Sequence, residues 1–118
     1  MTLITKALTE RFLANGRAQR AAMDKGDGAL DFKPVVKLFT PDAQCTWLLT
    51  ELDPDGGLAF GLCDLGLGEP ELGYVSLIEP ATVRRKLGLP VERELHFKGD
   101  KMISAYAEEA RARGHIVT

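Results

Sequence analysis

Residues 45–65 read CTWLLTELDPDGGLAFGLCDL and predict an antiparallel β-hairpin. Apolar side chains dominate both arms, Cys45–Leu52 and Leu58–Leu65, and the segment between them, Asp53–Gly57, has the composition of a turn. Proline fixes φ at the first central turn position, aspartate suits the next position, and glycine accepts a positive φ after it. The two arms should therefore lie side by side as antiparallel strands.

Other strands are expected on both sides of this hairpin. Val35–Phe39 is a short apolar run, and Leu72–Leu77 places Tyr74 on the same side as its first residue. Val91–Phe97 alternates as well, with Val91, Leu95 and Phe97 on one face together with Arg93. These segments bring the expected number of strands to five.

Helical patterns surround the strands. Ile4, Leu8 and Phe12 recur every four residues and predict a helix over residues 3–23, which Gly16 should weaken. The sequence from Ser76 to Glu79 fits a capping box, so a short helix should follow and end near Leu87. The last helix should begin at a cap formed by Asp100 or Ser104 and end at Arg113, before Gly114. We expect its inward side to carry Met102, Ile103, Tyr106 and Ala110.

This order of elements predicts an α+β fold. It is a mostly antiparallel five-stranded meander sheet with an N-terminal helix, a short helix before the last strand and a C-terminal helix, all packed on one face. A chain of 118 residues is expected to be a single domain, residues 1–118. Within it, residues 1–31 form the N-terminal helix and a mobile linker, and residues 33–114 form the α+β core.

Charge is segregated along the chain. Between Leu38 and Val83 there are eight carboxylates and no lysine or arginine, whereas residues 1–37 and 84–118 each carry a surplus of three basic side chains. The net charge of −2 argues against general nucleic-acid binding, which favours a positive face. No apolar run could span a bilayer, and charged residues interrupt the N-terminus where a secretion signal would be apolar, so we expect a cytoplasmic protein.

Three carboxylates on neighbouring predicted strands, Glu51, Asp64 and Glu71, are candidate metal ligands. Carboxylate oxygens suit Mg²⁺ or Mn²⁺, and clustered acids raise one another's pKa, as a general acid or base requires. The alternative is that the acids of this region form turns and face solvent, because their spacing matches no metal-binding loop. Cys45 and Cys63 are expected to be buried thiols, since neither has the neighbours of a metal site.

A binding surface is the second candidate site. Trp47 and Tyr74 could stack bases or anchor a partner, although a lone tryptophan on a central strand is more often part of the core. Together with nearby acids they would form an acidic sheet surface that binds a basic protein or imitates phosphates. Its hypothetical members are Trp47, Glu51, Asp64, Glu69, Glu71 and Tyr74.

Basic side chains on two predicted helices are the third candidate site. They could contact phosphates of a nucleic acid, or they could neutralise the acidic sheet of the same molecule. These residues are Arg17, Arg20, Arg84, Arg85 and Lys86. Two other patterns favour no chemistry: Gly66 and Gly68 precede a strand where a phosphate loop needs a helix, and His96 should lie on a solvated strand face.

Five sequence blocks resemble one protein family. They are PVVKLFTP (34–41), TWLLTELD (46–53), FG (60–61), ELGYVSL (71–77) and VERELHF (91–97). They are similar to the domain of unknown function 2958 family over about residues 33–109. The ELGY-x-SL block and the W-x-x-x-E-x-D strand are the most specific parts. Glu94 departs from an expected aspartate, and Pro80 interrupts the usual start of a helix.

The resemblance implies a bacterial, DNA-associated setting. Such proteins occur on conjugative plasmids, integrative elements and phages, near genes for DNA transfer and anti-restriction, and no catalytic residue carries over. We therefore expect a non-enzymatic accessory protein of a mobile genetic element, with a protein partner, possible homodimerisation and no cofactor. The alternatives are a Mg²⁺- or Mn²⁺-dependent, nuclease-like enzyme using Glu51, Asp64 and Glu71, and single-stranded nucleic-acid binding through the basic arms.

Overall fold

The computed structural model describes residues 4–40, 45–54, 57–76 and 91–118. The helices and strands in these residues are α1 (Lys6–Asp24), β1 (Val36–Phe39), β2 (Thr46–Leu52), β3 (Leu58–Asp64), β4 (Glu71–Ser76), β5 (Glu92–Arg93) and α3 (Ile103–Arg113). The predicted α+β fold with an antiparallel five-stranded sheet and two terminal helices is confirmed. The predicted short helix ending near Leu87, with its three basic residues, lies outside the described residues.

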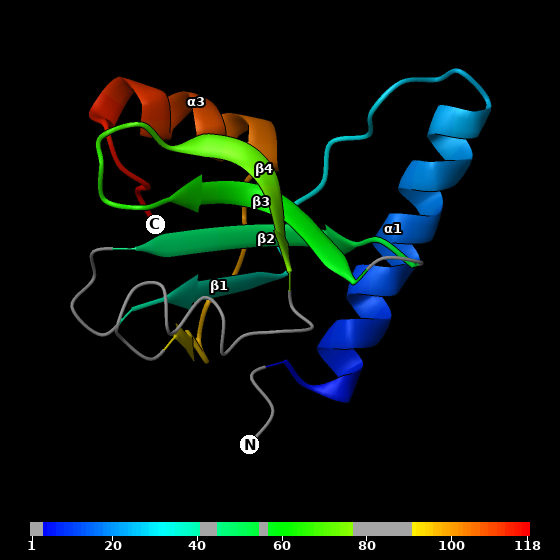
Figure 1. Cartoon of the computed structure of the whole chain (residues 1–118), viewed down its shortest axis with the longest axis horizontal. Helices are drawn as coiled ribbons and strands as arrows, with labels where there is room; N and C mark the ends of the chain where they lie inside the picture. The colour runs from blue at the N-terminus through cyan, green and yellow to red at the C-terminus, as the bar shows by residue number, and fades with distance from the viewer. Residues whose placement is uncertain (1–3, 41–44, 55–56, 77–90) are drawn as a thin grey trace.

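The predicted hairpin forms the middle of the sheet, whose strand order is β4-β3-β2-β1-β5 (Figure 1). Strands β2 and β3 pair antiparallel, with Leu48 opposite Leu62. The turn between them is closed where the backbone N–H of Asp53 donates to the carbonyl of Leu58 at 2.8 Å. Gly57 has a φ of 67°, as the turn chemistry requires.

A β-bulge in β2 changes the side of the sheet that Glu51 faces. Leu49 pairs with Gly61 and Glu51 with Phe60, so Thr50 is an additional residue without a partner across the ladder. Cross-strand partners share a face, and Glu51 therefore lies on the side opposite Leu49. Simple alternation along β2 would place Glu51 on the face of Trp47, and it fails here because it cannot anticipate an additional residue.

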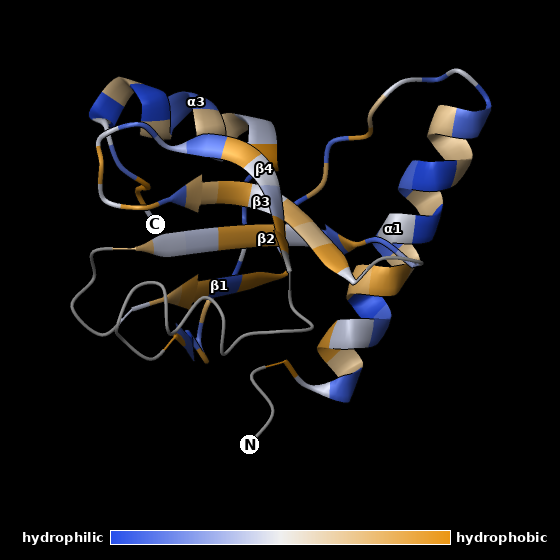
Figure 2. Cartoon of the chain, viewed as in Figure 1, coloured by the Kyte–Doolittle hydropathy of each residue, from blue (hydrophilic) through white to orange (hydrophobic). Residues whose placement is uncertain are grey.

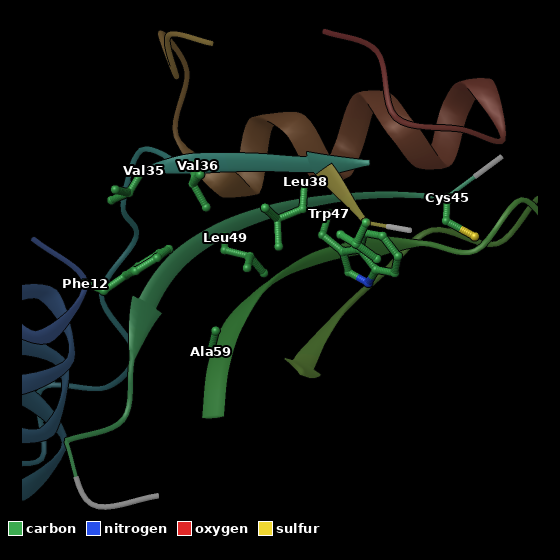
Figure 3. Packing of buried hydrophobic residues seen from close by; sticks show 9 residues of the cluster. Phe12, Val35, Val36, Leu38, Cys45, Trp47, Leu49 and Ala59 are labelled. Atoms are coloured by element: carbon green, nitrogen blue, oxygen red, sulfur yellow. The ribbon is translucent and has the colours of Figure 1, made fainter. Parts of the chain in front are cut away.

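The sheet is covered on both faces. On one face, hereafter the α1 face, Phe12 of the helix belongs to the same buried apolar cluster as Leu49 and Trp47 of the strands (Figure 3). On the other, the α3 face, Leu48 and Leu62 pack against α3. The prediction that the helices pack on one face is wrong. Both Leu48 and Leu49 are fully buried, so successive residues of β2 need cover on opposite sides.

Helix α1 crosses the end of the sheet at Gly16 (Figure 1). A Cβ atom there would lie 2.0 Å from the carbonyl oxygen of Leu52, so only glycine permits this approach. Asn15 joins the helix to the bulge, because its side-chain amide donates to the carbonyl of Thr50 at 2.8 Å. The glycine predicted to weaken the helix is thus the position where the helix meets the sheet.

Strand β5 is shorter than the predicted strand over residues 91–97. It pairs only with Leu38 and Phe39 of β1, and the chain then turns at Leu95 and His96. Val91 packs in the α1-face cluster, whereas Phe97 packs against the α3-face cluster, so the two do not share a face. The shared-face prediction is wrong because the turn breaks the alternation.

Helix α3 takes its N-terminal cap from the linker. The Asp31 carboxylate accepts from both the backbone N–H and the hydroxyl of Ser104, and the Phe32 carbonyl accepts from Ile103 N–H at 2.7 Å. The predicted cap residues are therefore wrong: Asp100 instead accepts from the hydroxyl of Tyr106 at 2.8 Å. These contacts attach the linker to the core and satisfy donors at the helix start.

The remaining predictions for α3 are confirmed in part. Ile103, Tyr106 and Ala110 are buried as expected, but Met102 is exposed because it lies just before the helix. Gly114 ends the helix with a φ of 80°. Apolar and hydrophilic residues alternate in bands along α1 and α3 (Figure 2). Neither helix of the described chain is long and apolar enough to cross a membrane.

Candidate functional site

The residues predicted to form one acidic surface lie in three different environments. Trp47 is part of the α1-face core, and Asp64 is buried near the β3–β4 loop. Glu69 and Glu71 are exposed at that same end of the sheet. Glu51 and Tyr74 lie at the other end, beside the β2–β3 hairpin turn, where they line a pocket. Of the six predicted residues, only Glu51 and Tyr74 line this pocket.

The three candidate metal ligands do not converge. Glu51 lies opposite Phe60, and Asp64 is four residues further along β3, about 13 Å away at the rise of a strand. Glu71 pairs with Cys63, whose side chain packs on the α1 face, away from the other two acids. Among the described residues there is no group of three or more histidine, cysteine, aspartate or glutamate side chains that could hold a metal ion.

Asp64 has a structural role. Its Oδ1 accepts from the backbone N–H of Gly66 at 2.9 Å, and its Oδ2 accepts from the backbone N–H of Ile116 at 3.0 Å. The first bond shapes the β3–β4 loop, where Gly66 has a φ of 79°. The second fastens the segment after α3 to the sheet. Both oxygens of this buried carboxylate are thus used within the molecule.

The pocket at the hairpin end has a volume of about 250 Å³ and lies between α1 and the sheet. We call it the hairpin-end pocket. The second half of α1 forms one wall, and residues from β2, β3 and β4 with the hairpin turn form the other. Its polar and aromatic lining includes Arg20, Asp24, Glu51, Asp53, Phe60 and Tyr74.

Glu51 is the most unusual group in the pocket. Only 8% of the residue is exposed, and burial raises the pKa of its carboxyl above the ordinary value. Among the described residues, its one hydrogen bond is from the Thr50 hydroxyl at 3.4 Å. That hydroxyl has a single proton and lies closer to the carbonyl of Phe60, at 3.1 Å. Within the described residues, Glu51 therefore has a single donor, which it shares with the carbonyl of Phe60. No buried side-chain oxygen among these residues lacks a partner, so the other oxygen of Glu51 is reached by solvent.

Apolar and aromatic surface adjoins this carboxylate. The rings of Phe60 and Tyr74 meet edge to face, with centroids 5.1 Å apart and an interplanar angle of 62°. Tyr74 is 68% exposed, and Leu58 and Met23 at the same pocket are exposed as well. Large aromatic and aliphatic side chains beside a buried charge are typical of a recognition surface.

One basic side chain at the rim of the pocket pairs with an acid of the turn. Arg20 Nη2 lies 2.8 Å from Asp53 Oδ1, and both side chains are partly exposed. Arg17 is exposed on α1, whereas Arg84–Lys86 lie outside the described residues. The contact between Arg20 and Asp53 agrees with the interpretation that basic arms neutralise acids of the same molecule.

Sequence reasoning missed the helical wall of the pocket and the part played by Phe60. Neither could be found by alternation, because the bulge at Thr50 turns Glu51 toward Phe60 and Tyr74. Two signals were present: a glycine inside an otherwise periodic helix, and two successive polar residues, Thr50 and Glu51, inside an apolar strand.

A second hollow, of about 400 Å³, lies beside α3. Most of its charged side chains have partners within the molecule. Lys101 pairs with Glu109 at 3.0 Å, and Asp100 accepts a hydrogen bond from Tyr106 at 2.8 Å. His96 lies at its edge on the exposed turn, where its backbone N–H donates to Glu94. Cys63, elsewhere on the sheet, is no activated nucleophile, because burial raises the pKa of its thiol to about 11.

The fold and the hairpin-end pocket define a small α+β domain with a recessed acidic and aromatic surface. The chain belongs to the family of proteins of unknown function DUF2958, whose family model matches residues 3–117. The resemblance predicted from the sequence blocks is thereby confirmed and extends over nearly the whole chain. No curated protein and no solved structure matches the chain significantly.

Proposed function

We propose that this protein is a non-enzymatic binding module that recognises a protein partner through the hairpin-end pocket. The observation that carries the proposal is Glu51, a buried carboxylate that lines a pocket beside the exposed ring of Tyr74. A largely buried carboxylate with a single shared donor costs stability, so its position in a pocket favours a role in binding rather than in folding.

The biological setting of the proposal comes from the family resemblance. Proteins with these sequence blocks are expected on mobile genetic elements, so the partner would be a component of a DNA-processing or host-defence complex. The protein would act as an accessory factor on that complex in the bacterial cytoplasm. It would need no cofactor, because binding requires only the surface of the pocket.

The geometry gives less support to the alternatives. A metal-dependent nuclease would need Glu51, Asp64 and Glu71 around one ion, and they lie on different faces and at different ends of the sheet. Single-stranded nucleic-acid binding would need stacking platforms among basic side chains, but Trp47 is in the core and Arg20 pairs with Asp53.

Capture from host lysate with matched variants tests the proposal. The double variant Glu51→Gln/Tyr74→Ala changes the pocket, and Glu69→Gln/Glu71→Gln is the control, since it neutralises two exposed acids at the opposite end of the sheet. Each tagged protein is incubated with lysate, with and without nuclease, and captured proteins are identified by mass spectrometry.

The proposal expects a defined protein that survives nuclease treatment, is captured by the wild type and the control, and is lost with the pocket variant. Equal capture by the pocket variant would place the binding surface elsewhere. Recovery that disappears after nuclease treatment would replace the proposal with nucleic-acid binding, whose affinity should fall steeply with salt.

A further inference from the structure

We infer that the hairpin-end pocket receives an arginine side chain of the partner, with its guanidinium against Glu51 and its flat face on the ring of Tyr74. The inference rests on the proposed function and names the chemical group that the pocket recognises. Three features of the pocket support it: the vacant acceptors of Glu51, the charge balance of the lining, and the exposed aromatic ring.

The first feature is the acceptor capacity of Glu51. An ionised carboxylate has about four lone-pair sites, and the Thr50 hydroxyl at 3.4 Å is the only donor near them in the described structure. Asp64, the other buried acid of the α3 face, fills both of its oxygens with backbone donors. Glu51 can therefore accept two parallel N–H bonds from a donor that enters the pocket.

The second feature is charge. The described lining of the pocket contains three carboxylates, those of Asp24, Glu51 and Asp53, against the single guanidinium of Arg20. Arg20 contacts Asp53 at 2.8 Å. The described lining therefore carries more carboxylates than cations. A pocket with this balance attracts a cation and repels phosphate. The occupant should therefore be a basic side chain rather than a nucleotide.

The third feature is the aromatic wall. A cation over the face of a tyrosine ring is attracted by the ring quadrupole, and arginine also stacks its plane on the ring. Tyr74 is exposed, and its ring contacts that of Phe60 edge to face, with the two ring centroids 5.1 Å apart. Arginine fits better than lysine, because its planar fork matches a carboxylate with two parallel bonds whereas an ammonium is a point charge.

The test is a nuclear magnetic resonance titration of the whole protein with N-acetyl-arginine amide. The neutral isostere N-acetyl-citrulline amide and N-acetyl-lysine amide serve as matched probes. We expect saturable shifts of the backbone amides of Glu51, Phe60 and Tyr74 with the arginine probe. Binding should be at least about tenfold weaker with citrulline, which lacks the charge-assisted bond, and severalfold weaker with lysine.

Two variants locate the interaction. Glu51→Gln should weaken arginine binding about tenfold, and Tyr74→Leu, which keeps an apolar side chain but removes the ring, should weaken it severalfold. Glu69→Gln is the control, because this exposed acid is at the far end of the sheet, and its affinity should match that of the wild type. Unchanged amide spectra away from the substitution confirm that each variant is folded.

Several outcomes would overturn the inference. They are shifts that do not saturate, equal binding of the arginine and citrulline probes, equal binding of the arginine and lysine probes, and full affinity in Glu51→Gln. None of these touches the lysate capture, where loss of a partner with Glu51→Gln/Tyr74→Ala would still support a binding module. If no protein is captured but the arginine probe still binds, the proposal of a protein partner is rejected while the cation-binding site remains.

Discussion

Glu51 and Asp64 are two buried carboxylates on the same face of one sheet, and they differ in what surrounds them. Asp64, at the loop end, is 5% exposed and accepts from the backbone N–H groups of Gly66 and Ile116. Glu51, at the hairpin end, is 8% exposed and has only a shared hydroxyl at 3.4 Å. Similar burial thus accompanies different surroundings: Asp64 holds two backbone segments, whereas Glu51, in our proposal, serves a binding site.

The role of a buried charge therefore depends on the hydrogen-bond donors around it rather than on its burial alone. A carboxylate whose lone pairs are filled within the molecule stabilises the loops that supply the donors. One whose lone pairs are vacant costs stability and is available to an incoming group. Of the four predictions that follow, three test this distinction and one tests the approach of α1 to the sheet beside the pocket; they begin with the largest expected effect.

Replacing Asp64 should destabilise the protein most. Asp64→Ala leaves the backbone N–H groups of Gly66 and Ile116 without their acceptor and should cost about 3 kcal/mol of unfolding free energy. Urea unfolding followed by circular dichroism measures the change. Glu71→Ala, which removes an exposed acid from the neighbouring strand, is the control and should change stability little. Equal losses in both variants would contradict the assigned role of Asp64.

Changing the helix crossing should have the next largest effect. Gly16→Ala places a Cβ atom 2.0 Å from the Leu52 carbonyl oxygen, so α1 must shift, at a cost of about 2 kcal/mol. The control is Gly73→Ala, because a Cβ atom there meets nothing within 4 Å. Thermal unfolding of both variants measures the difference. A Gly16→Ala protein as stable as the wild type would show that the helix does not approach the sheet at this residue.

Replacing Glu51 should change the free energy of unfolding in the opposite direction. Glu51→Gln keeps the shape of the side chain and removes a charge that burial disfavours, so it should stabilise the protein at neutral pH. Urea unfolding at pH 7 and at pH 4 measures the change. Destabilisation at pH 7 would mean that Glu51 has donors of its own and resembles Asp64.

The pH dependence of that effect follows from the direction of the pKa shift. Burial raises the pKa of Glu51 above 4.5, so over the interval from 4.5 to the raised value the folded protein binds a proton that the unfolded chain has lost. The contribution of Glu51 to stability is present below pH 4.5 and is lost as pH rises through the raised pKa. The advantage of Glu51→Gln should therefore shrink toward pH 4.

The smallest effect is expected at an exposed acid that has donors. Asp31 caps α3 through Ser104, and Asp31→Ala should lower the unfolding free energy by about 1 kcal/mol or less. Asp27→Ala, on the same linker, is the matched control, since the exposed Asp27 side chain accepts no hydrogen bond from the residues that the structure describes. If both variants behave like the wild type, the linker does not cap the helix in solution.

Local chemistry predicted much of the fold. The turn from Asp53 to Gly57 predicted the β2–β3 hairpin, the four-residue spacing of Ile4, Leu8 and Phe12 predicted α1, and Gly114 predicted the end of α3. These signals are read within a few residues of sequence, where φ preference and side-chain periodicity decide the conformation. They are therefore available before any tertiary contact is known.

Features that depend on distant residues were missed. The bulge at Thr50, stabilised by Asn15 of α1, reversed the side of Glu51, and Asp31 replaced the predicted caps of α3. The candidate site shows the same pattern. The sequence predicted Glu51 and Tyr74 as members of the site, but it did not predict that Trp47 and Asp64 would lie apart from them. Strand alternation carries no information about an additional residue or about a helix that crosses the sheet end.

A pH titration of the side-chain carboxyl carbon of Glu51, followed by nuclear magnetic resonance, shows whether this carboxylate lacks donors of its own. Resonance assignment is secured by the missing signal in Glu51→Gln. We expect the pKa of Glu51 to lie above 4.5 in the free protein. It should fall when N-acetyl-arginine amide is added, because a bound guanidinium stabilises the ionised form. A pKa at or below 4.5 in the free protein would contradict our account of Glu51.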